Sequence, residues 1–199
     1  MKKIIFFFAL LPCLSVFAQN EVVASKNIDL RNPFAAISDK KSPVTFNNPV
    51  IPGFYSDPSI CRVGEDYYCV SSTFEYFPGV PVFHSRDLVN WEQIGYCINR
   101  VSQLPKGMNI YAATLRYYNG TFYMITVNKK VGSNGCFIVS SKNPAGPWSD
   151  PVWIKGIWQI DPDLFFDEDG KAYMITAGMT LYEIDVNTGK LLTEGRKIW

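Results

Sequence analysis

From about residue 48 onward, hydrophobic residues come in short runs separated by turn residues. The run at 59–63 meets a turn at Gly64 and is followed by a second run at 67–72, which predicts a β-hairpin. Two further runs flank Asn119-Gly120, the strongest short hairpin signal. No long stretch keeps the 3.6-residue hydrophobic period of a helix. The pattern therefore predicts an all-β fold.

The same hairpin pattern occurs three times between residues 48 and 199. Asp57, Ala112 and Asp161 precede the three similar units, which are roughly fifty residues apart, and a repeat of this length with about four strands is typical of a β-propeller blade. The expected strands are 59–63, 67–72, 81–85, 91–94, 113–118, 121–126, 136–140, 152–154, 164–166, 172–176, 180–184 and 196–199. Because propellers have about four to eight blades, we expect about three blades of a longer protein. A compact three-bladed form or a plain sandwich is the alternative.

Two aspartates stand directly before a proline at the start of a unit, Asp57 before Pro58 and Asp161 before Pro162. The residue before a proline is biased toward an extended conformation, so each aspartate is expected at the mouth of a strand. A single Asp-Pro pair indicates no more than a turn. Its repetition in a blade-like pattern predicts two carboxylates at one end of the central channel, because the innermost strands of all blades line that channel.

The N-terminus has the pattern of a secretory signal peptide. A basic start is followed by a hydrophobic run at 4–17 and by a small-residue cleavage site at Ala18, and the run is short for a membrane span. We expect a secreted or periplasmic protein; an uncleaved anchor, or a lipoprotein modified at Cys13, is a minor alternative. The expected organisation is a signal peptide at 1–19, a linker or arm at 20–47 and a partial β domain at 48–199.

Charge and residue types exclude several classes of function. The net charge of +1 over 199 residues gives no support to nucleic-acid binding, which needs a basic face. His84 is the only histidine and no Cys-x-x-Cys pair occurs, so zinc chemistry is not expected, and a Ser-His-Asp triad would have to use His84. Aromatic residues make up 15% of the chain, which suits strands and also suits stacking on sugars.

Four cysteines follow the predicted signal peptide: Cys61, Cys69, Cys97 and Cys136. An oxidising compartment would permit disulfides, and Cys61 and Cys69 flank a hairpin turn across which they could pair. The chain has no dense cysteine framework, so we favour buried free thiols and leave the disulfide state open.

Taken together, four segments resemble glycoside hydrolase family 43, the five-bladed propeller enzymes that include β-xylosidases and α-L-arabinofuranosidases. The segments that carry the resemblance are 52–59, 72–80, 84–91 and 160–165. The resemblance extends from about residue 47 to residue 199. It implies an inverting glycosidase, in which a carboxylate base activates water and a carboxylic acid on the other side of the bond protonates the leaving group.

By this resemblance, Asp57 matches the general base, and Asp161 matches a third carboxylate that adjusts the pKa of the acid and orients the sugar. The general acid of the family is a glutamate in a Glu-Gly-Pro-like motif. Glu194 is followed by Gly195 and Arg196, which departs from that motif. We therefore expect the acid to lie beyond residue 199, and residues 1–199 alone to be inactive.

Phe74 and Tyr111 match positions that wall the sugar subsite in the family, although either could be a core aromatic. Tyr111 opens a Tyr-Ala-Ala segment where the family has Trp-Ala-Pro, which leaves xylose and arabinose as alternative substrates. The expected partner is an oligosaccharide or polysaccharide, with no nucleic acid and no membrane beyond the signal peptide. We expect Asp163 and the acidic cluster 167–169 to be solvated turn residues, because the spacing departs from a calcium loop.

No cofactor and no metal are expected in residues 48–199, and a structural calcium ion in a full-length propeller stays open. Two other classes of function remain as alternatives to an enzyme. One is a non-catalytic carbohydrate-binding propeller, and the other is a surface scaffold that binds proteins through its blades. The paired aspartates favour the enzyme, because a lectin needs no convergent carboxylates.

Overall fold

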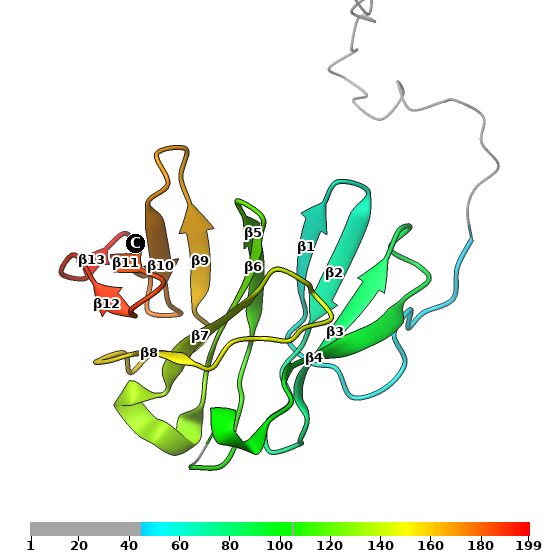
Figure 1. Ribbon diagram of the computed structural model, residues 1–199, viewed down its shortest axis with the longest axis horizontal. Coiled ribbons are helices and arrows are strands. Elements are labelled where there is room, and N and C mark those ends of the chain that lie inside the picture. Colours follow the sequence, from blue (N-terminus) through cyan, green and yellow to red (C-terminus); the bar gives the residue numbers. More distant parts are fainter. Residues whose placement is uncertain (1–44, 105) are drawn as a thin grey trace, which may run out of the picture. The chain divides into compact units, whose positions relative to one another are not determined.

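The computed structural model describes residues 45–104 and 106–199. The predicted signal peptide at 1–19 and the arm up to residue 44 lie outside the described residues. Phe46–Trp199 form one compact unit, which is built from three antiparallel sheets (Figure 1). Within the described residues, no helix is both long and hydrophobic enough for a bilayer span.

In each sheet the first four strands form a meander in which consecutive strands pair in chain order, and in the third sheet a fifth strand pairs with the third. The first sheet contains β1 (Ser59–Val63), β2 (Asp66–Val70), β3 (Gly79–Ser85) and β4 (Glu92–Ile98). The second contains β5 (Thr114–Tyr118), β6 (Thr121–Val127), β7 (Cys136–Ser141) and β8 (Val152–Ile154). The third contains β9 (Asp163–Phe166), β10 (Ala172–Ile175), β11 (Thr180–Asp185), β12 (Lys190–Leu191) and β13 (Arg196–Lys197). Two short 3-10 turns, η2 (Val101–Gln103) and η3 (Lys129–Asn134), lie between strands.

The predicted all-β class and the positions of most strands are confirmed. The end of the third sheet differs from the prediction of one closing strand at 196–199. Two short strands, β12 and β13, pair with different parts of β11, and residues 192–195 separate them. The outer edge of this sheet is therefore divided into two segments.

The hydrophobic core has two parts, one between the first and second sheets and one between the second and third. The second sheet contributes to both, because successive side chains of a strand point to opposite faces. On β6, Met124 lies in the first core and Ile125 in the second, and on β7 Phe137 and Ile138 divide in the same way. Burial of both faces explains the unbroken hydrophobic run at 136–139, which is typical of a strand covered on both sides.

The first strands of the three sheets lie beside one another in chain order, with β5 next to both β1 and β9. Hydrogen bonds connect them: the Leu115 amide donates to Ser59 Oγ at 3.1 Å, and Arg116 Nε donates to the Leu164 carbonyl at 3.1 Å. Arg116 also forms an ion pair of 2.7 Å with Asp163, at the start of β9. The expectation that Asp163 is a solvated turn residue is therefore wrong.

The four cysteines described are free thiols. Across the β1–β2 ladder, Cys61 pairs with Tyr68 and Ile60 pairs with Cys69. Cross-strand partners share a face and neighbours in a strand alternate, so Cys61 and Cys69 point to opposite faces. This register rules out the alternative of a disulfide between them. Burial raises the pKa of Cys69 to about 11 and that of Cys136 to about 12, so both thiols are protonated and unreactive at neutral pH.

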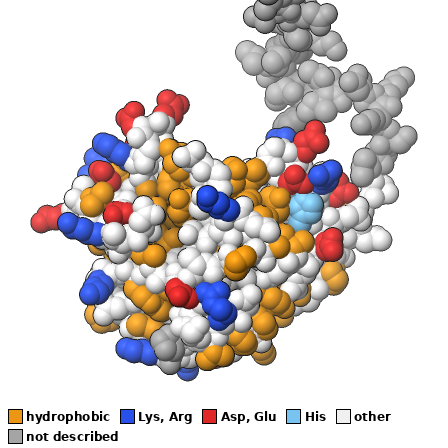
Figure 2. Space-filling view, in the orientation of Figure 1, with side chains coloured by type: hydrophobic (Ala, Val, Ile, Leu, Met, Phe, Trp, Pro, Cys, Tyr) orange, Lys and Arg blue, Asp and Glu red, His pale blue; other side chains and the backbone are white. Residues whose placement is uncertain are grey.

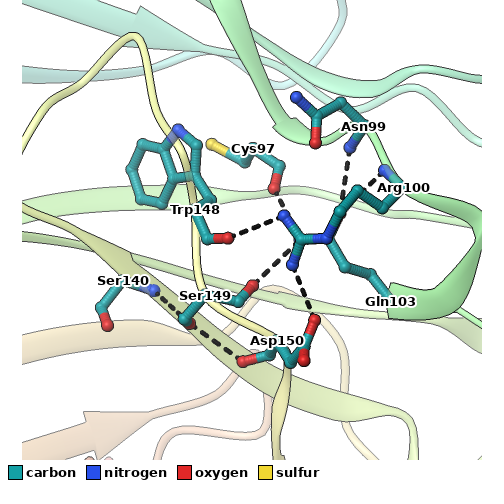
Figure 3. Close-up of polar contacts among 8 residues, drawn as sticks. All are labelled: Cys97, Asn99, Arg100, Gln103, Ser140, Trp148, Ser149 and Asp150. Atoms are coloured by element: carbon teal, nitrogen blue, oxygen red, sulfur yellow. Dashed lines mark hydrogen bonds and ion pairs between the residues drawn. The ribbon is translucent and has the colours of Figure 1, made fainter.

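The outer parts of the first and second sheets are connected by the side chain of Gln103, which is only 1% exposed (Figure 3). Its Oε1 accepts hydrogen bonds from the amides of Asn99 and Arg100, and its Nε2 donates to the carbonyls of Cys97 and Ser149. Arg100 adds two contacts by donating to the Trp148 carbonyl and to Asp150, and we call this set of hydrogen bonds around Gln103 the seam. One buried amide therefore satisfies four backbone groups at the junction of two sheets.

We expect Gln103→Leu to lower the free energy of unfolding by about 2–4 kcal/mol, because it leaves buried backbone groups without partners. Asp150→Asn is the matched control at the same seam. Its ion pair with Arg100 is largely solvent-exposed on the Asp150 side, so its loss should cost less than about 1 kcal/mol. Urea unfolding of the two variants measures the difference, and equal effects would contradict a special contribution of Gln103.

Candidate active site

Asp57, Ala112 and Asp161 occupy the same place in the three sheets, two residues before β1, β5 and β9. The antiparallel register of each hairpin, extended by two residues, sets Ser72 opposite Asp57 and Ala177 opposite Asp161. Backbone hydrogen bonds agree with this register, since the Ser72 amide donates to the Ser56 carbonyl and the Ala177 amide donates to the Ile160 carbonyl, each at 3.0 Å. Because the three strands are adjacent, both aspartates lie at one end of the same row of strands.

The backbone at both aspartates is left-handed rather than extended. The φ angle is 53° at Asp57 and 54° at Asp161, and Phe74 has a φ of 47°. The expectation of an extended residue before proline is therefore wrong for both aspartates, although their position at a strand mouth is confirmed. Aspartate enters this region more readily than most residues, but the conformation still costs on the order of 1 kcal/mol. Such strain is concentrated at functional sites, where the surrounding structure enforces it.

The carboxylates of Asp57 and Asp161 differ in hydrogen bonding. Asp57 Oδ2 accepts a hydrogen bond of 2.7 Å from the Ser72 hydroxyl, which is fully buried, and Ser72 Oγ lies 2.6 Å from Ser56 Oγ. At Asp161, the residue opposite is an alanine, and within the described part of the chain no hydrogen bond reaches its carboxylate. Sequence reasoning missed Ser72, and the signal that could have found it is the hairpin register, which sets it opposite Asp57.

The pKa of Asp161 is raised above its ordinary value. Partial burial is the larger cause, and the negative charge of Asp57 is the second. The strands that follow the two aspartates, β1 and β9, lie on either side of β5, which is compatible with this second cause. The site thus combines a carboxylate that accepts a hydroxyl hydrogen bond with one whose protonated form is favoured.

Aromatic side chains line the same end of the strands. The rings of Phe74 and Tyr111 are 5.7 Å apart, and Phe54 lies 6.0 Å from Phe74 and 6.2 Å from Tyr76. Phe54 and Tyr76 are 64% and 70% exposed, and together with Tyr96 and neighbouring residues they line a groove of about 310 Å³. Phe54 and Tyr76 were not predicted as site residues, although both lie in the segments that carry the family resemblance.

Other sequence candidates lie elsewhere. His84 Nε2 is 2.7 Å from Asp66 Oδ1 on the first sheet, while the neighbouring Ser85 hydroxyl donates to Asp87, so His84 forms no Ser-His-Asp triad. Glu194 follows β12, on the side of the third sheet away from β9. In the part of the chain that the structure describes, no cluster of three or more His, Cys, Asp or Glu side chains could hold a metal ion.

Acidic and basic side chains are scattered over the face shown in Figure 2, and hydrophobic side chains gather between them. This distribution offers no single basic patch on that face. Two carboxylates at equivalent strand starts, together with exposed aromatic rings, suit chemistry on a neutral sugar: carboxylates transfer protons, and aromatic rings stack on pyranose or furanose faces.

Comparison with known proteins agrees with chemistry on a sugar. The chain belongs to glycosyl hydrolases family 43, whose model matches residues 46–197. It is 50% identical over 165 residues to a non-reducing end alpha-L-arabinofuranosidase of Bacteroides ovatus. The match covers 77% of this chain and 31% of that protein. It is 46% identical over 175 residues to a xylosidase/arabinosidase of Butyrivibrio fibrisolvens, covering 78% of this chain and 34% of the relative.

Solved structures give the same result. The family 43 protein GH43B of a Bacteroides ovatus xyloglucan locus superposes with a TM-score of 0.70 at 49% identity, over 77% of this chain and 32% of its own. A GH43 protein of Bacillus licheniformis superposes with a TM-score of 0.70 at 39% identity. The match covers 77% of this chain and 33% of the Bacillus chain. These solved relatives are β-propellers, whereas the three antiparallel sheets described here do not form a closed propeller. The chain spans about a third of the length of the curated relatives it matches.

Asp161→Asn tests the raised pKa of Asp161 through stability. A carboxyl group with a raised pKa in the folded state stabilises the protein fully below the unfolded-state pKa, and this contribution is lost as pH rises through the folded-state pKa. At neutral pH the variant lacks an ionised carboxylate near Asp57, so it should have a slightly higher urea midpoint than the parent. The difference should shrink as pH falls below the ordinary carboxyl range.

Asp169→Asn is the control for loss of one carboxylate, because Asp169 lies in the exposed turn at the other end of β9. An Asp161→Asn protein that is less stable than the parent at neutral pH would contradict the repulsion between Asp57 and Asp161.

Proposed function

We propose that the protein is a secreted or periplasmic glycoside hydrolase that removes xylose or arabinose residues from oligosaccharides or polysaccharides with inversion at the anomeric carbon. The observation that supports the proposal is that Asp57 and Asp161, about a hundred residues apart in the chain, occupy the same position before β1 and β9, the two strands on either side of β5. Family membership and relatives named as xylosidases and arabinofuranosidases support it.

Asp57 is the proposed general base. Its exposed carboxylate takes a proton from the water that attacks the anomeric carbon, while the sugar-oxygen bond of the leaving group breaks. The hydrogen bond from Ser72 supports this role, because it gives the carboxylate a defined orientation. Asp161 is the proposed third carboxylate, whose charge raises the pKa of the general acid and which binds sugar hydroxyls.

The proposed general acid is a glutamate outside residues 48–199, in the remainder of a five-bladed propeller. The position of Glu194 supports this, because it follows an outer strand rather than preceding an inner one as Asp57 and Asp161 do. Protonation of the leaving group requires this acid, so the part of the chain described here is proposed to be inactive alone.

Phe74 and Tyr111 are the proposed walls of the sugar subsite. Their edge-to-face contact, with ring centroids 5.7 Å apart, forms a corner at the site into which a sugar ring could pack. Lys129 Nζ lies 6.0 Å from the centre of the Tyr111 ring and supports its orientation. Because xylose and arabinose differ in ring size and hydroxyl geometry, the remaining subsite residues decide between them.

The experiment is hydrolysis of nitrophenyl β-xyloside and nitrophenyl α-arabinofuranoside by the full-length protein and by Asp57→Asn. We expect turnover of at least one glycoside, and a loss of several orders of magnitude in the variant, because an amide cannot accept the proton from water. Circular dichroism should show that the variant is folded. Asp169→Asn, in the exposed turn, is the control and should retain full activity.

Two results would contradict the proposal in different ways. Undiminished turnover by Asp57→Asn removes Asp57 from the mechanism. A folded full-length parent that binds xylo-oligosaccharides but hydrolyses no glycoside favours the non-catalytic carbohydrate-binding module.

A further inference from the structure

We propose that Ser72, supported by Ser56, is a positioning residue that fixes the orientation of the Asp57 carboxylate. The inference rests on the proposed function, because it concerns the same site. It extends that function by assigning a role to two hydroxyl groups that act through Asp57.

The hydrogen bonds define one direction for this pair of hydroxyls. Ser72 has a single hydroxyl hydrogen, and the carboxylate Oδ2 of Asp57, at 2.7 Å, is a better acceptor than the Ser56 carbonyl at 3.1 Å. When that hydrogen is directed to Asp57, Ser56 must be the donor in the 2.6 Å contact between the two serine hydroxyls. Ser56 therefore donates to Ser72, and Ser72 donates to Asp57. We call these two hydrogen bonds the serine relay, and each strengthens the other.

The middle member of this relay cannot move freely. Ser72 is fully buried, its amide donates to the Ser56 carbonyl, and it lies opposite Asp57 in the extended β1–β2 register. A donor held in this way fixes Oδ2 in one direction. Oδ1 accepts no hydrogen bond within the described residues, and Asp57 is exposed, so Oδ1 is the oxygen directed to the attacking water.

The other two sheets show that this relay is specific to Asp57 and is not a requirement of the fold. In the second sheet Val127 occupies the place of Ser72, opposite Ala112, and it has no hydroxyl. In the third sheet Ala177 occupies the place of Ser72 opposite Asp161, and it has no hydroxyl. Among the three residues that stand two positions before β1, β5 and β9, Asp57 is the one whose carboxylate accepts a hydrogen bond from a cross-strand hydroxyl in the described part of the chain.

The test compares Ser72→Ala with Ser71→Ala in the full-length protein. Ser71 is the neighbouring buried serine, and its hydroxyl has no hydrogen-bond partner among the described residues, so its loss controls for removing a buried hydroxyl. We expect Ser72→Ala to lower kcat by about 10- to 100-fold with KM changed less than about twofold, because misorientation of the base affects the chemical step. Ser71→Ala should keep the parental kcat, and Ser72→Thr should recover most of the loss.

A second readout does not depend on turnover. The ¹³C resonance of the Asp57 carboxyl carbon, assigned by its absence in Asp57→Asn, should shift in Ser72→Ala and stay unchanged in Ser71→Ala. Should Ser72→Ala fail to fold, Ser56→Ala removes only the first donor of the relay. That variant should lower kcat by about 2- to 5-fold and should shift the same resonance.

The outcomes separate the two proposals. If Asp57→Asn is inactive but Ser72→Ala has parental kcat and an unmoved Asp57 resonance, the positioning role is wrong and the proposed function stands. The positioning role is also overturned if Ser72→Ala and Ser71→Ala lower kcat equally, or if Ser72→Thr does not recover kcat. If Asp57→Asn retains full activity, the proposed function fails whatever Ser72→Ala does.

Discussion

The geometry of the site depends on how β1, β5 and β9 are held against one another. These strands belong to different sheets, so no backbone ladder joins them. Their separation is set by the packed cores between sheets and by a few side-chain hydrogen bonds, in which Ser59 binds the backbone of β5 and Arg116 binds both the backbone and a carboxylate of β9. Arg116 is half-buried and paired at 2.7 Å, in a setting where a guanidinium forms stronger and more directional contacts than at an exposed site. Because Arg116 joins β5 to β9, this contact helps to set where the start of β9 lies relative to β5, although neither Asp57 nor Asp161 forms a hydrogen bond with Arg116 in the described structure.

The unlike environments of the two aspartates follow from one difference in sequence on a repeated backbone. Both residues have nearly the same φ angle and the same position two residues before a strand. The residue opposite is Ser72 in one sheet and Ala177 in the other, so one carboxylate accepts a hydroxyl hydrogen bond while the pKa of the other is raised by burial and by its neighbour's charge. Repetition of the fold thus supplies the position of a carboxylate, and the cross-strand residue decides whether that carboxylate accepts a hydroxyl hydrogen bond.

The sequence allowed the all-β class, the repeat and most strand positions to be predicted, because hydrophobic alternation and turn residues are local signals. It failed where tertiary contacts decide the outcome. The local preference of Asp57 and Asp161 for extended backbone is overridden by the left-handed turn into each strand. Asp163 was taken for a turn residue because its partner, Arg116, is 47 residues away in the chain. The opposite orientation of Cys61 and Cys69 required the register of the hairpin, which a count of cysteines does not contain.

The site is built from features that oppose stability. Asp57, Phe74 and Asp161 have strained backbone angles, and burial and the charge of Asp57 raise the pKa of Asp161. The features that stabilise the fold lie elsewhere, in the two cores between the sheets and in the seam around Gln103. Because the strand heads lie outside the paired ladders, their side chains can change without loss of a ladder hydrogen bond. Ala112 illustrates this: it occupies the same position as the two aspartates, carries no carboxylate, and precedes a sheet that is just as regular. The chain therefore separates the residues proposed to carry the chemistry from those that hold the sheets together, which is the reason that a repeated unit can present different groups at each copy of one position.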